Sequence, residues 1–133
     1  MQEATILNEY RIIAMVGLST DPSRPSHRVA KYLINHGYKV IPVNPGAQEI
    51  LGTRSYSDMS SIPEPVEIVD IFRRSEEVMP IVDEAIKIGA KVVWMQEGVI
   101  NEEAALRARD AGLLVVMDRC MLKEHERLNK KQD

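Results

Sequence analysis

Five short apolar runs, rich in Val and Ile, recur along the chain and alternate with more polar segments. None of the runs alternates strictly between apolar and polar residues, which is the pattern of strands buried on both faces of a sheet. The runs span residues 11–17, 38–44, 67–72, 91–96 and 113–118. Pro42 interrupts the second run, and proline lacks the amide that a central strand needs. The pattern therefore predicts five buried strands, with an edge position or a bulge in the second.

Segments with helical periodicity lie between these runs. An apolar stripe from Val29 to Ile34 follows Ser26 and stops at Gly37, and a second helix is predicted after Ser75, with Ser75 as its N-cap. Pro80 predicts a kink or a restart in that second helix. A third helix, with a face of alanines, is predicted after Asn101. Further helices are expected over residues 2–9 and 121–130.

Strands that alternate with helices at this spacing imply right-handed crossovers and a parallel sheet covered on both faces. We therefore predict an α/β fold: a single Rossmann-like, doubly wound domain over residues 1–133, with a mainly parallel five-stranded sheet. Residues 45–66, which are rich in Pro and Gly, are expected to form the only long irregular connection.

The composition of the chain limits the kinds of binding partner that we expect for it. The chain is 44% hydrophobic and 28% charged, as in soluble globular proteins, and its net charge is −3 without any polybasic block. We therefore expect no nucleic-acid partner and, because no apolar run approaches the length of a membrane span, no membrane partner. The N-terminal residues lack the pattern of a signal peptide, so a cytoplasmic location is expected. Cys120, a lone cysteine, cannot form an intrachain disulfide.

Ligands of doubly wound sheets bind beyond the carboxyl ends of the strands. The turn after the first strand runs from Gly17 to Ser26 and lacks the G-x-G-x-x-G pattern of dinucleotide-binding proteins. It carries hydroxyls, including those of Ser19 and Ser26, and the guanidinium of Arg24, and it leads into a helix N-terminus. These groups are suited to phosphate. A Ser- and Pro-rich loop with a simple N-cap is the alternative interpretation.

The end of the second strand argues against NAD. Dehydrogenases place an acidic residue there to bind the ribose, whereas this chain has Val43, Asn44 and Pro45. Three arginines, Arg54, Arg73 and Arg74, would suit an additional phosphate on the ribose. Coenzyme A or NADP therefore fits better than NAD, although Asn-Pro is also a common turn.

Cys120 and Glu97 are predicted to lie at the same edge of the sheet. Cys120 next to Arg119 could be a reactive thiol or a small buried residue. Glu97 could bind a ligand or cap the helix that follows. The three histidines are too dispersed for a metal motif, so no metal is expected.

Four stretches of the chain strongly resemble the CoA-binding domain family of small single-domain proteins. They are GLSTDPSRPSHRVAKYLINHGYKVIPVNP at 17–45, DIFRRSEEV at 70–78, WMQEGVINEEAALRARDAG at 94–112 and VVMDRCMLKEHERL at 115–128. The wider family is similar to the nucleotide-binding domain of the succinyl-CoA synthetase α subunit. The TGxxG-type turn of that subunit is not reproduced here, and its catalytic histidine belongs to a second domain that this chain is too short to contain.

The resemblance implies coenzyme A bound across the carboxyl edge of the sheet. Gly17, Leu18 and Ser19 would hold the pyrophosphate near Ser26. Val43, Asn44 and Pro45 would lie beside the adenosine. Phe72 and Arg73, with Gln96, Glu97 and Gly98, would lie along the pantetheine.

The expected function is that of a protein that binds CoA or an acyl-CoA, as a sensor or carrier component, with no catalytic residue of its own. A thiol or redox protein that uses Cys120 beside the CoA thiol is a second possibility. The sequence also leaves open a subunit that borrows the active site of a protein partner, a homo-oligomer, and an NADP-binding protein.

Overall fold

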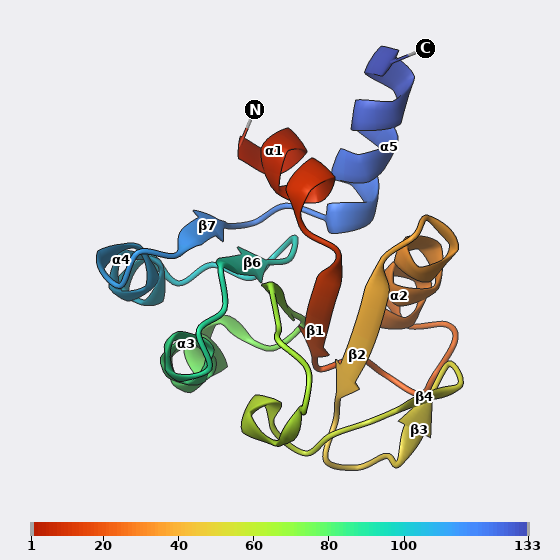
Figure 1. The fold of residues 1–133 in the computed structure, drawn as a ribbon, viewed down its shortest axis with the longest axis horizontal. Helices are drawn as coiled ribbons and strands as arrows, with labels where there is room; N and C mark the ends of the chain where they lie inside the picture. Colours follow the sequence, from red (N-terminus) through yellow and green to blue (C-terminus); the bar gives the residue numbers. More distant parts are fainter. Residues whose placement is uncertain (1, 133) are drawn as a thin grey trace.

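The architecture is a parallel sheet of five strands, as predicted, and these strands lie in the order β2-β1-β5-β6-β7 (Figure 1). The structure is a computed structural model that describes residues 2–132, with side chains up to residue 130. Every neighbouring pair in this sheet is parallel. The strands are β1 (Ile12–Val16), β2 (Lys39–Val43), β5 (Ile68–Ile71), β6 (Val92–Met95) and β7 (Leu114–Val116).

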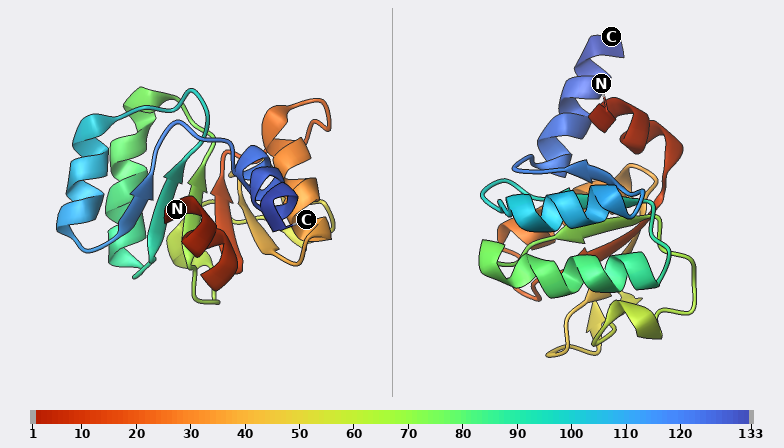
Figure 2. Two further views of the ribbon diagram at one scale, coloured as in Figure 1. Left: turned by 90° about the horizontal axis from the view of Figure 1, so that it is seen from above. Right: turned by 90° about the vertical axis from the view of Figure 1, so that its left-hand side faces the viewer.

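Helices cover both faces of the sheet, so the fold is doubly wound (Figure 2). One layer holds α3 and α4, and the other holds α1, α2 and α5. The helices are α1 (Gln2–Glu9), α2 (Pro25–Asn35), α3 (Val78–Lys87), α4 (Glu102–Asp110) and α5 (Met121–Gln132).

Alternate residues of each strand feed two separate hydrophobic cores. In β1, Ala14 and Val16 join the core under α3 and α4, while Ile13 and Met15 join the core under α1, α2 and α5. This division explains the unbroken apolar runs, because neither face of the sheet meets water. The alanine face of α4 is fully buried in the first core, as the small-residue pattern indicates.

The second strand lies at an edge of the sheet, which accounts for Pro42. Because the strand is at an edge, the amide that proline lacks is not missing from the hydrogen bonds in the middle of the sheet. The edge is not bare, since the amide of Tyr56 donates to the carbonyl oxygen of Pro42 at 3.1 Å. The connection over residues 45–66 is less irregular than predicted. It contains an antiparallel pair, β3 (Glu49–Ile50) with β4 (Thr53–Arg54), and a 3₁₀ turn, η1 (Met59–Ser61).

The prediction of Ser75 as an N-cap is wrong. Ser75 begins a 3₁₀ turn, η2 (Ser75–Glu77), and α3 starts after it. The Ser75 hydroxyl instead accepts a hydrogen bond from the amide of Ile100 at 2.9 Å. Pro80 falls in the first turn of α3, where an amide has no helical acceptor, so α3 runs through it as one helix from Val78 to Lys87. Asn101 does cap α4, accepting from the amide of Ala104.

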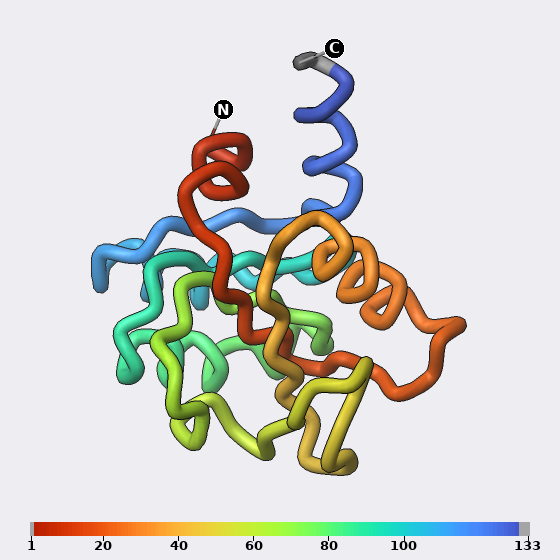
Figure 3. The backbone as a smooth tube through the Cα atoms, turned by 45° about the vertical axis from the view of Figure 1, so that its right-hand side comes forward, coloured from red at the N-terminus to blue at the C-terminus, as the bar shows by residue number. Residues whose placement is uncertain are grey.

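The two terminal helices, α1 and α5, lie side by side (Figure 3). The buried hydroxyl of Tyr38, just before β2, donates to the carbonyl oxygen of Leu7 at 2.6 Å and so fixes α1 to the sheet. No helix within the described part of the chain is long and apolar enough to cross a membrane.

Candidate functional site at the carboxyl edge of the sheet

The connections after β1 and β5 leave in opposite directions at the centre of the sheet. The chain after β1 leads to the edge strand β2, whereas β5 leads to β6 and β7 on the other side. Such a switch point opens a crevice beyond the strand ends. A cavity of about 540 Å³ lies there, lined by Gly17, Ser19, Val43, Asn44, Pro45, Phe72, Arg73, Arg74, Glu77, Gln96, Glu97 and Val99.

Gly17 forms the turn at the end of β1 in a conformation that favours glycine, with φ of +91°. A Cβ atom at this position would lie 2.2 Å from the carbonyl oxygen of Phe72 and 3.0 Å from Cδ of Arg73. The missing side chain therefore lets the chain after β5 approach the backbone of the first turn. Both segments then face the same cavity.

The loop after Gly17 is held by its own side chains. The amide of Ser19 donates to the hydroxyl of Ser26 at 2.9 Å, and the hydroxyl of Ser19 accepts from the amide of Asp21. Hydrogen bonds from the amide and hydroxyl of Ser23 lower the pKa of Asp21 below its ordinary value. The loop is thus an ordered turn.

The interpretation of this loop as a simple N-cap required Ser26 to cap α2, but Ser26 is not the N-cap. The helix begins at Pro25, with Arg24 as N-cap and no side-chain capping bond. Ser26 is buried in the first turn and its hydroxyl accepts from the loop. A smaller cavity of about 270 Å³ brings Arg24 and Ser26 together with Gly17, Ser19 and Phe72, so the two cavities share three residues.

Asn44 joins the loops after β1 and β2. Its Nδ2 donates to the carbonyl oxygen of Leu18 at 3.0 Å, and its Oδ1 accepts from the amide of Gly46 at 2.8 Å. The side chain of Leu18 is fully buried, so only its backbone is available to a ligand. Pro45 lines the main cavity and also a neighbouring one of about 550 Å³, which contains Arg54.

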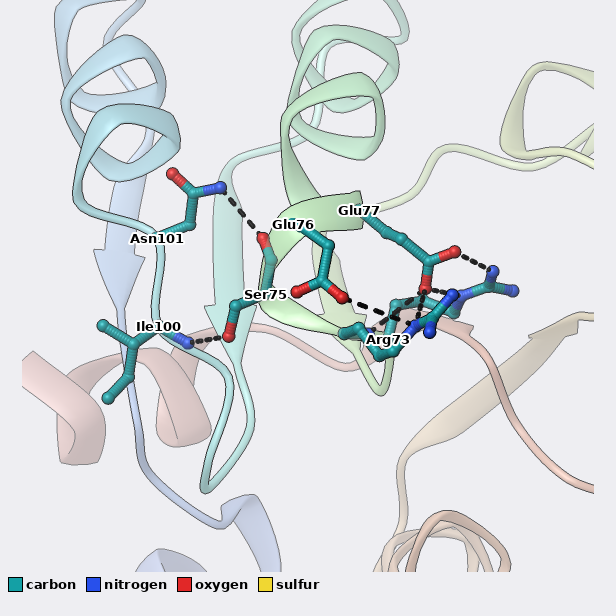
Figure 4. A network of polar contacts seen from close by, with 7 residues as sticks. Arg73, Ser75, Glu76, Glu77, Ile100 and Asn101 are labelled. Atoms are coloured by element: carbon teal, nitrogen blue, oxygen red, sulfur yellow. Dashed lines mark hydrogen bonds and ion pairs between the residues drawn. The ribbon is translucent and has the colours of Figure 1, made fainter.

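The end of β5 carries a cluster of charges (Figure 4). Glu77 accepts from Nη2 of Arg73 at 2.8 Å and lies 3.4 Å from Nε of Arg74. The hydrogen bond from Arg73 lowers the pKa of Glu77 to about 2, so this carboxylate is charged at neutral pH. The pairing with Glu77 also raises the pKa of Arg73.

The end of β6 contributes a buried amide and an exposed carboxylate. Gln96 is 2% exposed and its Nε2 donates to Oδ1 of Asp70 at 2.6 Å. Glu97 pairs with Lys123 of α5 at 3.0 Å. The amide of Gly98 donates to Oδ1 of Asp118 at 2.8 Å, and Gly98 is not among the residues that line the cavity.

Most residues singled out from the sequence thus converge on one edge of the sheet. Glu77 and Val99 also line the main cavity but were not singled out from the sequence, and Arg74, which the sequence suggested for a phosphate on the ribose, lines it too. The spacing of Arg73 and Glu77, four residues apart and just before a helix, is the signal that could have identified the ion pair.

Cys120 and the histidines lie away from the main cavity. Cys120 is half-buried, packs against the core under α1, α2 and α5, and does not line this cavity. His36 and His125 are closer than their sequence separation suggests, with ring centroids 5.1 Å apart. Within the described residues, no group of three or more His, Cys, Asp or Glu side chains could hold a metal ion.

The comparisons with known proteins agree with this architecture. Residues 11–126 match the family model described as CoA binding domain. Protein YneT of Bacillus subtilis (strain 168) is 42% identical over 120 residues, which cover 90% of this chain and 89% of YneT. A protein from Pyrococcus horikoshii OT3 is 47% identical with a TM-score of 0.94, over 96% of this chain and 90% of that one.

A larger protein contains a similar unit. The acetyl-coenzyme A synthetase 1 from Ca. Korarchaeum cryptofilum, solved with phosphate and ADP, is 29% identical with a TM-score of 0.77. The match covers 89% of this chain but only 28% of the synthetase. The match over residues 11–126 and the likeness to YneT show that this chain belongs to the CoA binding domain family.

Proposed function

We propose that this protein binds coenzyme A, or an acyl-CoA, in the crevice at the carboxyl edge of the sheet, as a binding or sensing protein without catalysis of its own. The observation that carries the proposal is the close approach of the end of β5 to the glycine turn after β1. A Cβ atom at Gly17 would lie only 2.2 Å from the carbonyl oxygen of Phe72. This approach leaves backbone, hydroxyl and guanidinium groups facing one cavity.

The diphosphate of CoA would lie at the start of α2. The dipole of an 11-residue helix favours an anion at its N-terminus, although Pro25 has no amide and the amides of His27 and Arg28 already donate to the carbonyl oxygen of Arg24. Ser19, Arg24 and Ser26 line the small cavity at this end, and Arg73 faces the adjoining larger one. A diphosphate that spans the two cavities could therefore be contacted by both arginines.

The adenosine and the pantetheine would extend to opposite sides of the diphosphate. Val43 and Pro45 lead toward the cavity that holds Arg54, which suits a 3′-phosphorylated ribose. Gln96, Glu97 and Val99 line the other side, where the pantetheine would lie. Asn44 would act through the loops that it ties together, since both ends of its amide already bond to backbone.

Calorimetry with CoA, dephospho-CoA, NADP and NAD tests the proposal. We expect CoA to bind most tightly. If arginine contacts the 3′-phosphate, dephospho-CoA should bind more weakly by roughly 1.5–3 kcal/mol, the range for hydrogen bonds to charged groups. Equal binding of all four compounds, or no binding of any of them, would refute the proposal.

A further inference from the structure

Glu77 competes with any anion for the two arginines at the end of β5. Its carboxylate meets Arg73 edge-on, with Oε2 at 2.8 Å from Nη2 and Oε1 at 3.3 Å from Nε. The same Oε1 lies 3.4 Å from Nε of Arg74. Glu76 approaches Arg74 at 3.6 Å, so the cluster holds two positive and two negative charges. An arriving phosphate therefore meets arginines that are already neutralised.

Arg73 is placed for the ligand although its charge is engaged by Glu77. Its Cδ would lie 3.0 Å from a Cβ on Gly17, so the aliphatic stem runs directly along the glycine turn. Arg73, Glu77, Gly17 and Ser19 all line the same cavity. A phosphate beside the turn would consequently lie close to both the guanidinium and the carboxylate that neutralises it.

The backbone that carries Glu77 is anchored to a neighbouring loop, whereas its partly exposed carboxylate is held by Arg73 and by the side chain and the backbone amide of Arg74. The 3₁₀ turn Ser75–Glu77 is tied to the loop before α4, because the Ser75 hydroxyl accepts from the amide of Ile100 and the Ser75 carbonyl accepts from Nδ2 of Asn101 (Figure 4). The Glu77 side chain is 31% exposed. Rotation of this side chain would release both guanidinium groups, and it would also give up the 3.4 Å hydrogen bond that Oε1 accepts from the backbone amide of Arg74.

We propose that Glu77 is a specificity-determining counter-ion, which holds Arg73 and Arg74 until a phosphate group of the ligand displaces its carboxylate. This inference rests on the proposed function. Its consequence is that an anion binds well only when other contacts of the ligand offset the loss of the ion pair. The low pKa of Glu77, caused chiefly by Arg73, keeps this competitor charged at neutral pH.

Calorimetry on Glu77→Gln and on the matched control Glu76→Gln tests the inference. Removing the competing charge should tighten CoA binding roughly three- to tenfold at low salt, and the gain should shrink below about twofold at 0.5 M salt. The control should change CoA affinity by less than about twofold, because Glu76 is 71% exposed and its ion pair among the described residues is with Arg74 at 3.6 Å. Pantetheine, measured by its displacement of CoA, carries no phosphate and should bind both variants like the wild type.

The outcomes separate the two proposals. A wild-type protein that fails to bind CoA removes the proposed function and this inference with it. Wild-type binding of CoA together with unchanged or weaker binding by folded Glu77→Gln overturns only the inference, and so does an equal gain for pantetheine. Carbon-13 NMR of the wild type supplies a test independent of any variant: saturation with CoA should raise the pKa of the Glu77 carboxyl, and an unchanged pKa overturns the inference.

Discussion

Asp70 should make this protein less stable as the pH rises from about 4 to 7, which is opposite to the usual behaviour of a carboxylate. It lies within β5, flanked by Met15 of β1 and Trp94 of β6, and is fully buried. Its Oδ1 accepts from Gln96, but its Oδ2 has no hydrogen-bond partner among the side chains that the structure describes. Burial raises the pKa of Asp70 from 3.8 to about 7, and the bond from Gln96 opposes this only in part.

The magnitude follows from linkage between proton binding and folding. Between pH 4 and 7 the folded protein keeps a proton on Asp70 that the unfolded chain has released. Unfolding therefore releases a proton in this range, so a rise in pH favours unfolding. Each factor of ten in acidity corresponds to about 1.4 kcal/mol, and a change from 3.8 to about 7 amounts to a loss of about 4 kcal/mol, complete above pH 7.

Urea unfolding of the wild type and of Asp70→Asn at pH 4, 5, 6, 7 and 8 measures this effect. The variant cannot ionise at position 70, whereas all other titrating groups are shared, so the difference between the two free energies of unfolding isolates Asp70. We expect this difference to shift in favour of the variant by about 4 kcal/mol between pH 4 and 8. Any fixed cost of the amide moves the whole curve without changing its slope. Parallel pH profiles for the two proteins would refute the reasoning.

Three further predictions concern the turn at the site and the anchoring of the terminal helices. Gly17→Ala should lower the free energy of unfolding by more than about 2 kcal/mol in thermal or urea unfolding, because it adds a 2.2 Å clash to the cost of placing alanine in a left-handed backbone conformation. The control Gly112→Ala has φ of +90° and open space around it, so it should cost only about 1–2 kcal/mol. Comparable losses for both would show that the close approach to Phe72 is not rigid. Tyr38→Phe should cost about 1 kcal/mol in urea unfolding by removing a 2.6 Å hydrogen bond to Leu7, whose oxygen keeps a second donor in Arg11, and an unchanged midpoint would count against this anchor. His125 has a pKa lowered by burial and then by His36 and Arg11. Below about pH 6.5 the free energy of unfolding of the wild type should therefore fall relative to that of His125→Asn, and a constant difference between the two proteins would contradict this assignment.

The strands and their burial were predictable because the signal is repeated and local. Each strand meets a helix layer on both faces, so Asp70 is the one polar residue in the interior of these five strands. The order of the strands came only with the structure, because periodicity reports burial and not neighbours. The pair β3–β4 was missed because two-residue strands carry no periodic signal.

The predicted site residues gather at one edge because parallel strands all end there, which needs no knowledge of side-chain contacts. The contacts themselves could not be predicted. Ser26 looks like an N-cap in the sequence, yet its hydroxyl accepts from Ser19 seven residues earlier. In the sequence Asn44 looks like a ligand contact or a turn former. In the structure its side chain joins two loops, through a hydrogen bond to Leu18, 26 residues earlier in the chain.

Polar side chains at the carboxyl edge of the sheet are held in place by hydrogen bonds between neighbouring segments. Asn44 links the loops after β1 and β2, and Gln96 links the end of β6 to Asp70 of β5. Each of these side-chain amides forms a hydrogen bond to a neighbouring segment, so hydrogen bonds connect the strand ends around the crevice in pairs. Arg73 differs, because its partner Glu77 is a partly exposed carboxylate. Within this set, the Arg73–Glu77 pair is the contact that an anionic ligand could replace at the least cost, and the affinity of the crevice should therefore depend on this ion pair more than on the amides around it.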